Sequence, residues 1–367
     1  MTQRFFSFLA LALILSVSTL WAKPRTEQQA RLIAEQYTTQ HLSHRELAAL
    51  RSAATPLLTL VSAPAADAGG VPVHRQMTAP AVQTLPSAYY VYNIGSERGY
   101  VMISGDDLLP EVIAYADAGA FLPDEEQPEH IASFFAQVRA ALHALVERGE
   151  PVEMPRTTQL RPEGVDPLLG NIRWGQSYPF NTLCPNKNGR SVVGCVATAL
   201  AQILRYHQWP NQGEGICSYT ERDGTDHRVD FSQYTYDWAH MPERYNDPSS
   251  ATSEETQALS TLAYHAGVAV EMMYAPSGSG SYTPLVARAL ADHFRYDKRV
   301  SFKSRSNYTQ SSWEQMLRAE LIAARPIVYS GSGSGGGHAF VCDGYDAEGL
   351  FHINWGWGGM SDGYFNL

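Results

Sequence analysis

A proline-rich segment divides this chain of 367 residues into two differently patterned parts. Residues 150–167 read EPVEMPRTTQLRPEGVDP and hold four prolines. Because proline lacks a backbone N–H and interrupts helices and central strands, we expect no regular element to run through this segment. A chain of this length is also too long for one ordinary domain. The sequence therefore predicts two globular units joined by an exposed linker, in which Arg156 and Arg161 are open to a processing protease.

The composition excludes several classes of function. Hydrophobic residues make up 44% of the chain and charged residues 17%, which is enough apolar material for a sizeable core and argues against wholesale disorder. The formal net charge of −10 argues against nucleic-acid binding, which needs a basic stripe to neutralise phosphates. The sequence has no HExxH motif, CxxC pair or phosphate-binding loop, so we expect neither a metal nor a cofactor.

Residues 1–22 are predicted to be a secretory signal peptide. Arg4 precedes a mostly apolar run from Phe5 to Val17, which is too short to span a bilayer comfortably, and small and polar residues follow. We expect cleavage after Ala22, with an uncleaved anchor as the alternative. The remaining protein would then be exported and not bound to a membrane.

Residues 23–160 are predicted to form a small α+β unit. Helical spacing within residues 26–51 predicts a helix, and residues 52–87 predict a loop or extended segment because they are rich in Ala, Pro and Gly. Two β-rich runs around a Gly-Ser-Glu-Arg-Gly turn predict a hairpin within residues 87–105, and EVIAYAD predicts a third strand. An apolar stripe between Pro128 and Gly149 predicts a longer helix.

The second unit is helical first and strand-rich last. Apolar spacing predicts a helix that starts near Cys195 and ends at Trp209-Pro210, and a Thr252–Glu255 capping box predicts the next one. Two further helices are expected after Thr283-Pro284 and after a Ser312–Gln315 pair. Four β-type runs follow Pro326: PIVYSG, HAFVCDGYD, LFHINWG and GYFNL. This segregation of helices and strands predicts an α+β domain with an antiparallel sheet.

One cysteine stands where an apolar helix begins, in SVVGCVATALAQILRYHQWP, residues 191–210. Cys195 could be a small buried residue that packs the start of this helix. It could instead be a nucleophile, because the aligned N–H groups at a helix N-terminus favour a thiolate. Of the other cysteines, Cys342 lies in an apolar strand pattern and is most simply a buried filler. Cys184 and Cys217 could pair as a disulfide in an exported protein.

A nucleophilic cysteine needs a base that takes its proton. His338 follows the glycine-rich run GSGSGGG, which predicts a flexible loop, and begins a strand, so it could project into a cleft. It could also be a loop histidine with no role. His207 falls on the apolar side of the helix and is predicted to be packed, and His352 lies inside a strand.

The reaction also needs a group that orients the base and donors for the oxyanion. Asn354 could accept the Nδ1–H of His338, or Trp355 could stack on its ring; neighbouring strand residues point to opposite faces, so only one can easily face the imidazole. Core packing is the alternative for the tryptophan. Gln176 could hold the oxyanion together with the backbone N–H of Cys195, although a loop glutamine is often only solvated.

Three motifs in this order resemble one family. GCVATALAQILRYHQWP, GGHAFVCDGYD and FHINWGWGGMSDGYF are similar to the streptopain-like family of secreted bacterial cysteine peptidases, and the resemblance covers most of residues 165–367. It implies an α+β, papain-like, two-lobed catalytic domain over residues 161–367, with a helical lobe and an antiparallel sheet lobe. It also implies a smaller α+β inhibitory prodomain over residues 23–160.

The resemblance assigns roles to single residues. It implies Cys195 as the nucleophile, His338 as the general base, Gln176 as the oxyanion donor, and Trp355 rather than Asn354 as the orienting residue. It further places two glycines at the cleft, where they would act through backbone groups: Gly280 and Gly337.

The sequence therefore predicts a secreted cysteine endopeptidase made as a zymogen. Its substrates would be proteins or peptides, and its own docked prodomain would inhibit it by displacing His338. The alternatives are a catalytically silent binding module on a peptidase fold and a transglutaminase-like acyl transferase. The family continues beyond the GYFNL with which this sequence ends, so we expect an edge strand of the sheet to be missing.

Overall fold

The computed structural model describes residues 23–52, 56–65, 86–127, 129–149, 151, 164–333 and 336–367. The predicted signal peptide, most of the predicted linker and the helix-opening Pro128 lie outside these residues. No helix in the described ranges is both long enough and apolar enough to cross a membrane.

The N-terminal unit has three helices and four strands among its described residues: α1 (Glu27–His41), α2 (His44–Ser52), β1 (Leu58–Ser62), β2 (Tyr89–Ile94), β3 (Tyr100–Ser104), β4 (Val112–Ala116) and α3 (Glu129–Glu147). The predicted hairpin is confirmed, since β2 and β3 pair antiparallel from Tyr89 opposite Ser104 to Asn93 opposite Tyr100. Within residues 52–87, predicted as a loop or extended segment, β1 is extended and pairs with β2, a strand that the sequence did not single out. The sequence of this short strand shows no sustained alternation of apolar and polar residues. Its place in the sheet therefore depends on pairing with β2.

The second unit begins with a helical lobe that also contains one hairpin. Its main elements are α4 (Cys195–His207), β5 (Ile216–Thr220), β6 (Asp226–Asp230), α5 (Ser253–Ala269) and α6 (Leu285–Asp292). The predicted capping box of α5 is confirmed, because Thr252 and Glu255 each accept the other's backbone N–H. The β5–β6 hairpin was not expected from the sequence.

The chain then crosses into a sheet lobe, which contains α7 (Gln310–Ile322), β7 (Ile327–Gly333), β8 (Gly336–Tyr345), β9 (Phe351–Asn354) and β10 (Gly363–Phe365). All four β-type runs predicted from the sequence are strands. The expected start of α7 at Ser312 is wrong: Thr309 caps the helix, and its hydroxyl accepts the N–H of Ser312. The mistaken cap arose because Ser312 and Thr309 both match the capping pattern.

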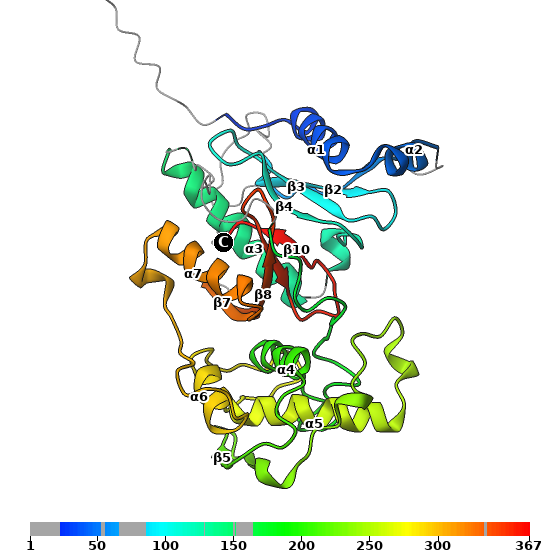
Figure 1. The fold of residues 1–367 in the computed structure, drawn as a ribbon. Helices are drawn as coiled ribbons and strands as arrows, with labels where there is room; N and C mark the ends of the chain where they lie inside the picture. Colours follow the sequence, from blue (N-terminus) through cyan, green and yellow to red (C-terminus); the bar gives the residue numbers. More distant parts are fainter. Residues whose placement is uncertain are drawn as a thin grey trace, which may run out of the picture.

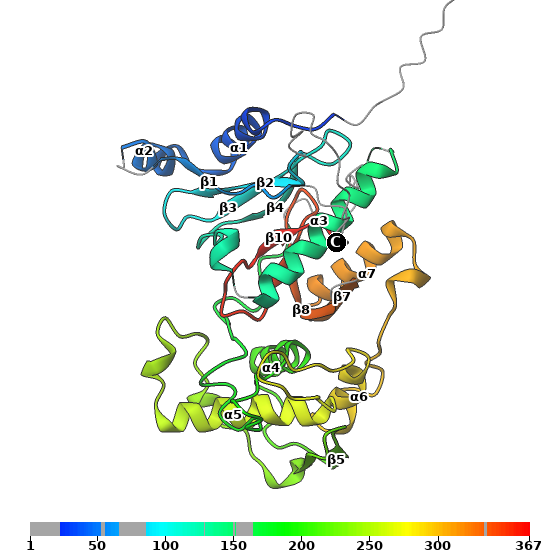
Figure 2. The same ribbon diagram turned by 180° about the vertical axis from the view of Figure 1, so that it is seen from behind.

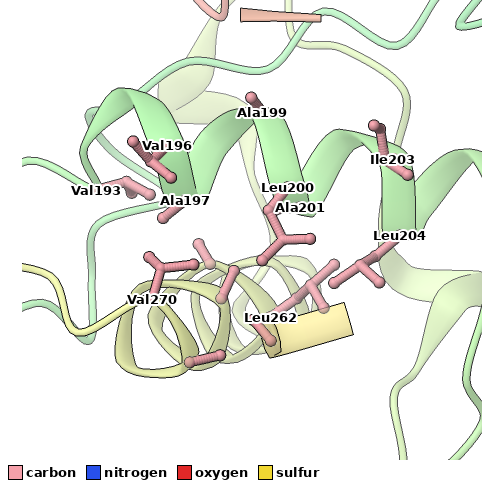
Figure 3. Packing of buried hydrophobic residues seen from close by; sticks show 14 of the residues in the cluster. Val193, Val196, Ala197, Ala199, Leu200, Ala201, Ile203, Leu204, Leu262 and Val270 are labelled. Carbon is pink, nitrogen blue, oxygen red and sulfur yellow. The ribbon is translucent and has the colours of Figure 1, made fainter. Parts of the chain in front are cut away.

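Helix α4 lies between the two lobes and packs against both α5 and β8. Its residues from Val196 to Leu204 are all buried. Figure 3 shows Leu200 and Leu204 extending from α4 toward Leu262 on α5. A helix buried on every side is fixed in orientation, so the residue at its first position is fixed as well.

The two units share one antiparallel sheet of eight strands, in the order β1-β2-β3-β4-β10-β9-β8-β7. They join where β10 pairs with β4, with Tyr364 opposite Tyr115 and Phe365 opposite Ala114. In Figures 1 and 2 this sheet and α3 lie above the helical lobe, with β10 beside the strands of the N-terminal unit. β10 therefore has a partner on both sides.

The hydrophobic core is shared in the same way. One cluster contains Phe121 and Phe135 of the N-terminal unit together with Trp313, Phe340 and Trp355 of the sheet lobe. Part of the apolar surface of the N-terminal unit is therefore buried against the second unit.

Candidate active site

Cys195 is the first residue of α4 and is half-buried. The helix is capped by Gly194 at φ +88°, where a Cβ would come within 2.7 Å of the Met272 side chain. Only glycine fits this left-handed, crowded position, and it turns the chain sharply into the helix. Burial raises the pKa of the Cys195 thiol, while the backbone N–H groups of Ala339, Val196 and Cys195 oppose that rise.

His338 lies in β8, opposite Gly331 of β7. The glycine-rich run before it is therefore not the flexible loop that the sequence predicted, since Gly331–Gly333 and Gly336–His338 pair as strands. His338 Nε2 lies 2.9 Å from the carbonyl oxygen of Trp355. A carbonyl can only accept, so Nε2 carries the proton and Nδ1 is the nitrogen with the basic lone pair.

Two tryptophans flank this imidazole. The Trp355 ring lies 6.0 Å from the His338 ring between centroids, and the Trp357 ring lies nearer, at 4.8 Å. Trp355 contacts the histidine most directly through its backbone carbonyl, while its indole N–H donates to Ser361. Trp357 was not predicted as a site residue; its ring stacks on that of Trp355, with centroids 5.4 Å apart.

Asn354 is engaged elsewhere. Its Oδ1 accepts from Gln202 Nε2 at 3.0 Å, and its Nδ2 donates to the carbonyl of Ile172 at 2.8 Å. Gln202 also accepts the backbone N–H of Trp174 at 3.1 Å. Asn354 thus ties α4 to the segment that carries Gln176, and its geometry does not fit an orienting role toward His338.

One cleft of about 500 Å³ collects four of the six predicted site residues: Gln176, Cys195, Gly337 and His338. The backbone carbonyl of Gln176 accepts the N–H of Val193 at 2.9 Å, which holds Gln176 beside the start of α4. Trp355 lies behind His338. The cleft has no group of three or more potential metal ligands, as is true of all the residues that the structure describes.

Gly280 is not brought to this cleft. Its N–H and its carbonyl pair with the carbonyl and N–H of Met273, at 3.0 and 2.9 Å. The cleft wall is formed instead by the preceding residues Ser277, Gly278 and Ser279. The predicted loop therefore reaches the cleft, but through the residues before Gly280, while Gly280 itself is held in a local bridge to Met273.

A buried carboxylate anchors this wall. Glu221 Oε2 accepts the backbone N–H of Tyr274 at 2.8 Å, and Oε1 receives Lys187 Nζ at 2.8 Å and His227 Nε2 at 2.7 Å. The side chain of Glu221 is only 5% exposed. Glu221 therefore connects three separate segments: the loop before α4, the β5–β6 hairpin and the cleft wall.

The N-terminal unit closes one side of the cleft through α3. Ile131 lines the cleft and is buried. The Phe134 ring lies 4.5 Å from the Trp355 ring, 6.0 Å from Trp357 and 6.1 Å from His338. Of these two apolar side chains of the N-terminal unit, Ile131 thus lines the cleft itself, while Phe134 packs against the aromatic residues around His338.

The structure also shows where the other predicted cysteines and histidines lie. All four cysteines are free, so the Cys184–Cys217 pair is not formed, and Cys342 is buried as expected. His207 was predicted to be packed but is exposed, because α4 reaches solvent in its last turn. His352 in β9 is bonded to Asp343 at 2.6 Å.

Family models match both parts of the chain. The Peptidase C10 family matches residues 174–365, and the Spi protease inhibitor family matches residues 22–142. The thiol protease/hemagglutinin PrtT of Porphyromonas gingivalis is 37% identical over 295 residues, which are 76% of this chain and 34% of that protein. The chain thus spans about a third of PrtT. Streptopain of Streptococcus pyogenes is 34% identical over 302 residues, 77% of this chain and 74% of streptopain.

Solved structures agree. A fragment of prointerpain A from Prevotella intermedia has a TM-score of 0.67 and 32% identity, covering 76% of this chain and 88% of that one. Active interpain A has a TM-score of 0.53 and 38% identity, covering 59% of this chain and 91% of that one. The predicted fold class is confirmed: a two-lobed α+β cysteine peptidase fold preceded by a smaller α+β inhibitor-like unit.

Proposed function

Because the chain belongs to the peptidase C10 family, we propose that it is the zymogen of an exported cysteine endopeptidase. In this proposal residues 1–22 direct export, residues 23–160 inhibit, and residues 161–367 catalyse. The observation that carries it is the single cleft in which Gln176, Cys195 and His338 meet under Ile131 of the N-terminal unit. Family members named as thiol proteases supply the reaction class.

The proposed reaction is acyl transfer to water. His338 Nδ1 takes the proton of the Cys195 thiol, and Sγ attacks the carbonyl carbon of a peptide bond. The side-chain amide of Gln176 and the N–H of Cys195 hold the oxyanion. His338 then returns its proton to the leaving amine, and water hydrolyses the thioester.

Inhibition follows from the same contacts. With α3 docked, Phe134 occupies the space over the Trp355 and His338 rings, and burial keeps the Cys195 thiol protonated by raising its pKa. Removing the N-terminal unit would admit both water and substrate, and the helix N-terminus would then favour the thiolate.

Labelling with an epoxide thiol-protease inhibitor tests this proposal. The full chain and the chain cut near Arg156 or Arg161 are incubated with inhibitor, and the adduct is located by mass analysis. We expect rapid labelling of Cys195 in the cut form and slow labelling in the intact form. No adduct on Cys195 in the cut form would favour a silent binding module, and equal rates in both forms would rule out inhibition by residues 23–160. Products formed with added amines would identify an acyl transferase.

A further inference from the structure

One permanently charged side chain lines the cleft, and the reaction proposed above does not use it. Apart from Cys195 and His338, the lining residues are apolar, aromatic, glycine, hydroxyl or amide residues, with the single exception of Arg173. No Asp or Glu is among the described residues that line this cleft. Arg173 is thus the one permanent cation among the described residues that line the cleft, in a chain whose net charge is −10.

The fold holds Arg173 firmly at this position. Its backbone N–H donates to the carbonyl of Glu243 at 2.8 Å. Its stem lies against Gly359, where a Cβ would come within 2.6 Å of Arg173 Cδ. Gly359 is at φ +93°, so this position both needs glycine for its backbone and leaves room for the arginine stem.

Among the residues that the structure describes, none forms an ion pair with the Arg173 guanidinium. The charge of Arg173 acts on Asp362. Burial raises the pKa of Asp362 to about 6, and Arg173 is among the groups that oppose this rise. The Asp362 carboxylate is nevertheless committed to the backbone N–H of Trp355, at 2.8 Å. A half-buried guanidinium with free donors is a ready partner for a carboxylate ligand.

The neighbours of Arg173 indicate which part of a substrate would meet it. The following segment contacts the loop of Trp357, since Gly358 donates its N–H to the carbonyl of Trp174 at 3.0 Å. Trp357 in turn packs on His338, the group that would protonate the leaving amine. The wall of Ser277–Ser279 comes from a different part of the chain, near Val192. Arg173 therefore belongs to the His338 side of the cleft, where the leaving group departs.

The geometry points to Arg173 as a specificity residue that binds a substrate carboxylate on the C-terminal side of the scissile bond. This inference rests on the proposed peptidase function. The carboxylate is either the side chain of a Glu or Asp just after the scissile bond or the C-terminus of a short substrate. Both sources present the same planar group to the guanidinium, which can bind it with two parallel hydrogen bonds.

Matched peptides test the subsite on the cut enzyme. One set carries Glu or its neutral isostere Gln at each of the three positions after the scissile bond, with an amidated C-terminus; a second set carries Ala there, with a free or amidated C-terminus. We expect kcat/KM to favour one Glu peptide, or the free acid, by roughly three- to tenfold at low salt. Arg173→Gln should abolish this preference, Arg173→Lys should restore part of it, and Arg173→Glu should reverse it toward a Lys peptide.

Controls separate failure of the subsite from failure of the peptidase. Titration with the epoxide inhibitor gives the concentration of active Cys195 in every variant, so a misfolded variant is recognised and normalised. Arg299→Gln removes an exposed arginine outside the cleft and should leave the preference unchanged. Hydrolysis with no discrimination between Glu and Gln, or between acid and amide, overturns the subsite and leaves the peptidase intact. Inhibitor labelling without hydrolysis of any peptide contradicts the proposed function itself.

Discussion

Cys195 can be replaced by alanine without disturbing the start of α4, because alanine fits a half-buried position and keeps its backbone N–H. We expect the purified Cys195→Ala precursor to stay at full length when the wild type processes itself, as measured by gel electrophoresis over time. The matched control is Cys217→Ser, since Cys217 Sγ donates to the carbonyl of Val268 at 3.3 Å and a serine hydroxyl can do the same. Self-processing by Cys195→Ala would mean that another residue is the nucleophile.

Gln176 offers a second prediction for a single residue. Its side chain is only half-buried and its structural hydrogen bond uses the backbone carbonyl, so Gln176→Ala should leave the unfolding transition unchanged. Turnover of the cut enzyme should fall by about 10²–10³, the usual loss for one oxyanion donor. Ser177→Ala, at an exposed neighbour in the same cleft, is the control. Full turnover by Gln176→Ala would show that a different donor holds the oxyanion.

Single residues can be selected from the sequence where chemistry restricts the choice. A cysteine at a helix start and a histidine after a glycine run are visible in the sequence, and the cleft contains both. Trp357, Glu221 and Arg173 were not selected, because a tryptophan, a glutamate and an arginine are common surface or core residues. Their roles depend on distances across the fold, such as the 4.8 Å between the Trp357 and His338 rings.

Among the elements, the β5–β6 hairpin has a specific role in shaping the cleft. Glu221 follows β5 and connects the wall residue Tyr274, Lys187 and His227. Glu221→Ala would leave the buried N–H of Tyr274 and the imidazole of His227 without their acceptor, while Lys187 Nζ keeps Asp223 at 2.7 Å. We expect a loss of about 2–4 kcal/mol in the free energy of unfolding, measured in urea.

The same variant should also affect substrate binding. Loosening of the wall at Ser277–Ser279 should raise KM for peptides more than it lowers kcat, while a small reagent such as iodoacetamide still alkylates Cys195 of the cut enzyme at the wild-type rate. Glu271→Ala is the control, because Glu271 forms an exposed pair with Arg288, and such pairs contribute at most about 1 kcal/mol. Equal effects of the two substitutions would contradict an anchoring role for Glu221.

Elements were predictable from the sequence where local signals mark their ends. The capping box of α5, the turn between β2 and β3, and the apolar period of α4 all gave the right element. β1 and the β5–β6 hairpin were missed because their strands are short and lack sustained alternation. β1 pairs with β2, which is distant in the sequence, and the residues of β5 and β6 are largely polar. No local hydrophobic pattern therefore predicts either pairing.

At the scale of the whole molecule, we expect the aromatic contacts of Phe134 with the second unit to contribute to the proposed inhibition. Phe134→Ala removes the ring that lies 4.5 Å from Trp355. We expect inhibitor labelling of Cys195 in the intact precursor to become about ten- to a hundredfold faster, because removal of a packed Phe costs several kcal/mol when fully buried and less here. Leu145→Ala, a half-buried position on the same helix, is the control. An unchanged labelling rate for Phe134→Ala would show that this contact does not keep the precursor inhibited.

Docking of the two units should weaken as pH rises. Tyr115 donates to Asp346 at 2.9 Å across the interface, and burial raises the pKa of both Asp346 and the nearby Asp117. His352 is not counted with them: burial lowers its pKa and Asp343 raises it, and Asp343 belongs to the same unit as His352, so the net upward shift does not depend on docking. The two buried carboxyl groups bind protons more tightly than they would in water. Their contribution to docking is complete below the ordinary carboxylate pKa and is lost as pH rises through the raised values.

Labelling rates can measure this pH dependence. The rate for the intact precursor, divided by that for the cut form at the same pH, should increase between about pH 4 and pH 8; the ratio removes the ionisation of Cys195 itself. In Asp346→Asn the amide oxygen still accepts from Tyr115 but has no charge, so the increase should flatten. A ratio that falls with pH would contradict this assignment of the interface groups.

The pairing of β10 with β4 also sets an order of events during synthesis. Because β10 lies far beyond β4 in the sequence, the sheet of the nascent chain has an open edge at β4 until β10 has been synthesised. Closing that edge is a contact between distant parts of the sequence and so belongs to the slow, late stage of folding. The N-terminal unit is thus a template on which β10 forms. We expect a cut in the linker to be productive after this closure, whereas an earlier cut would leave β10 without its template.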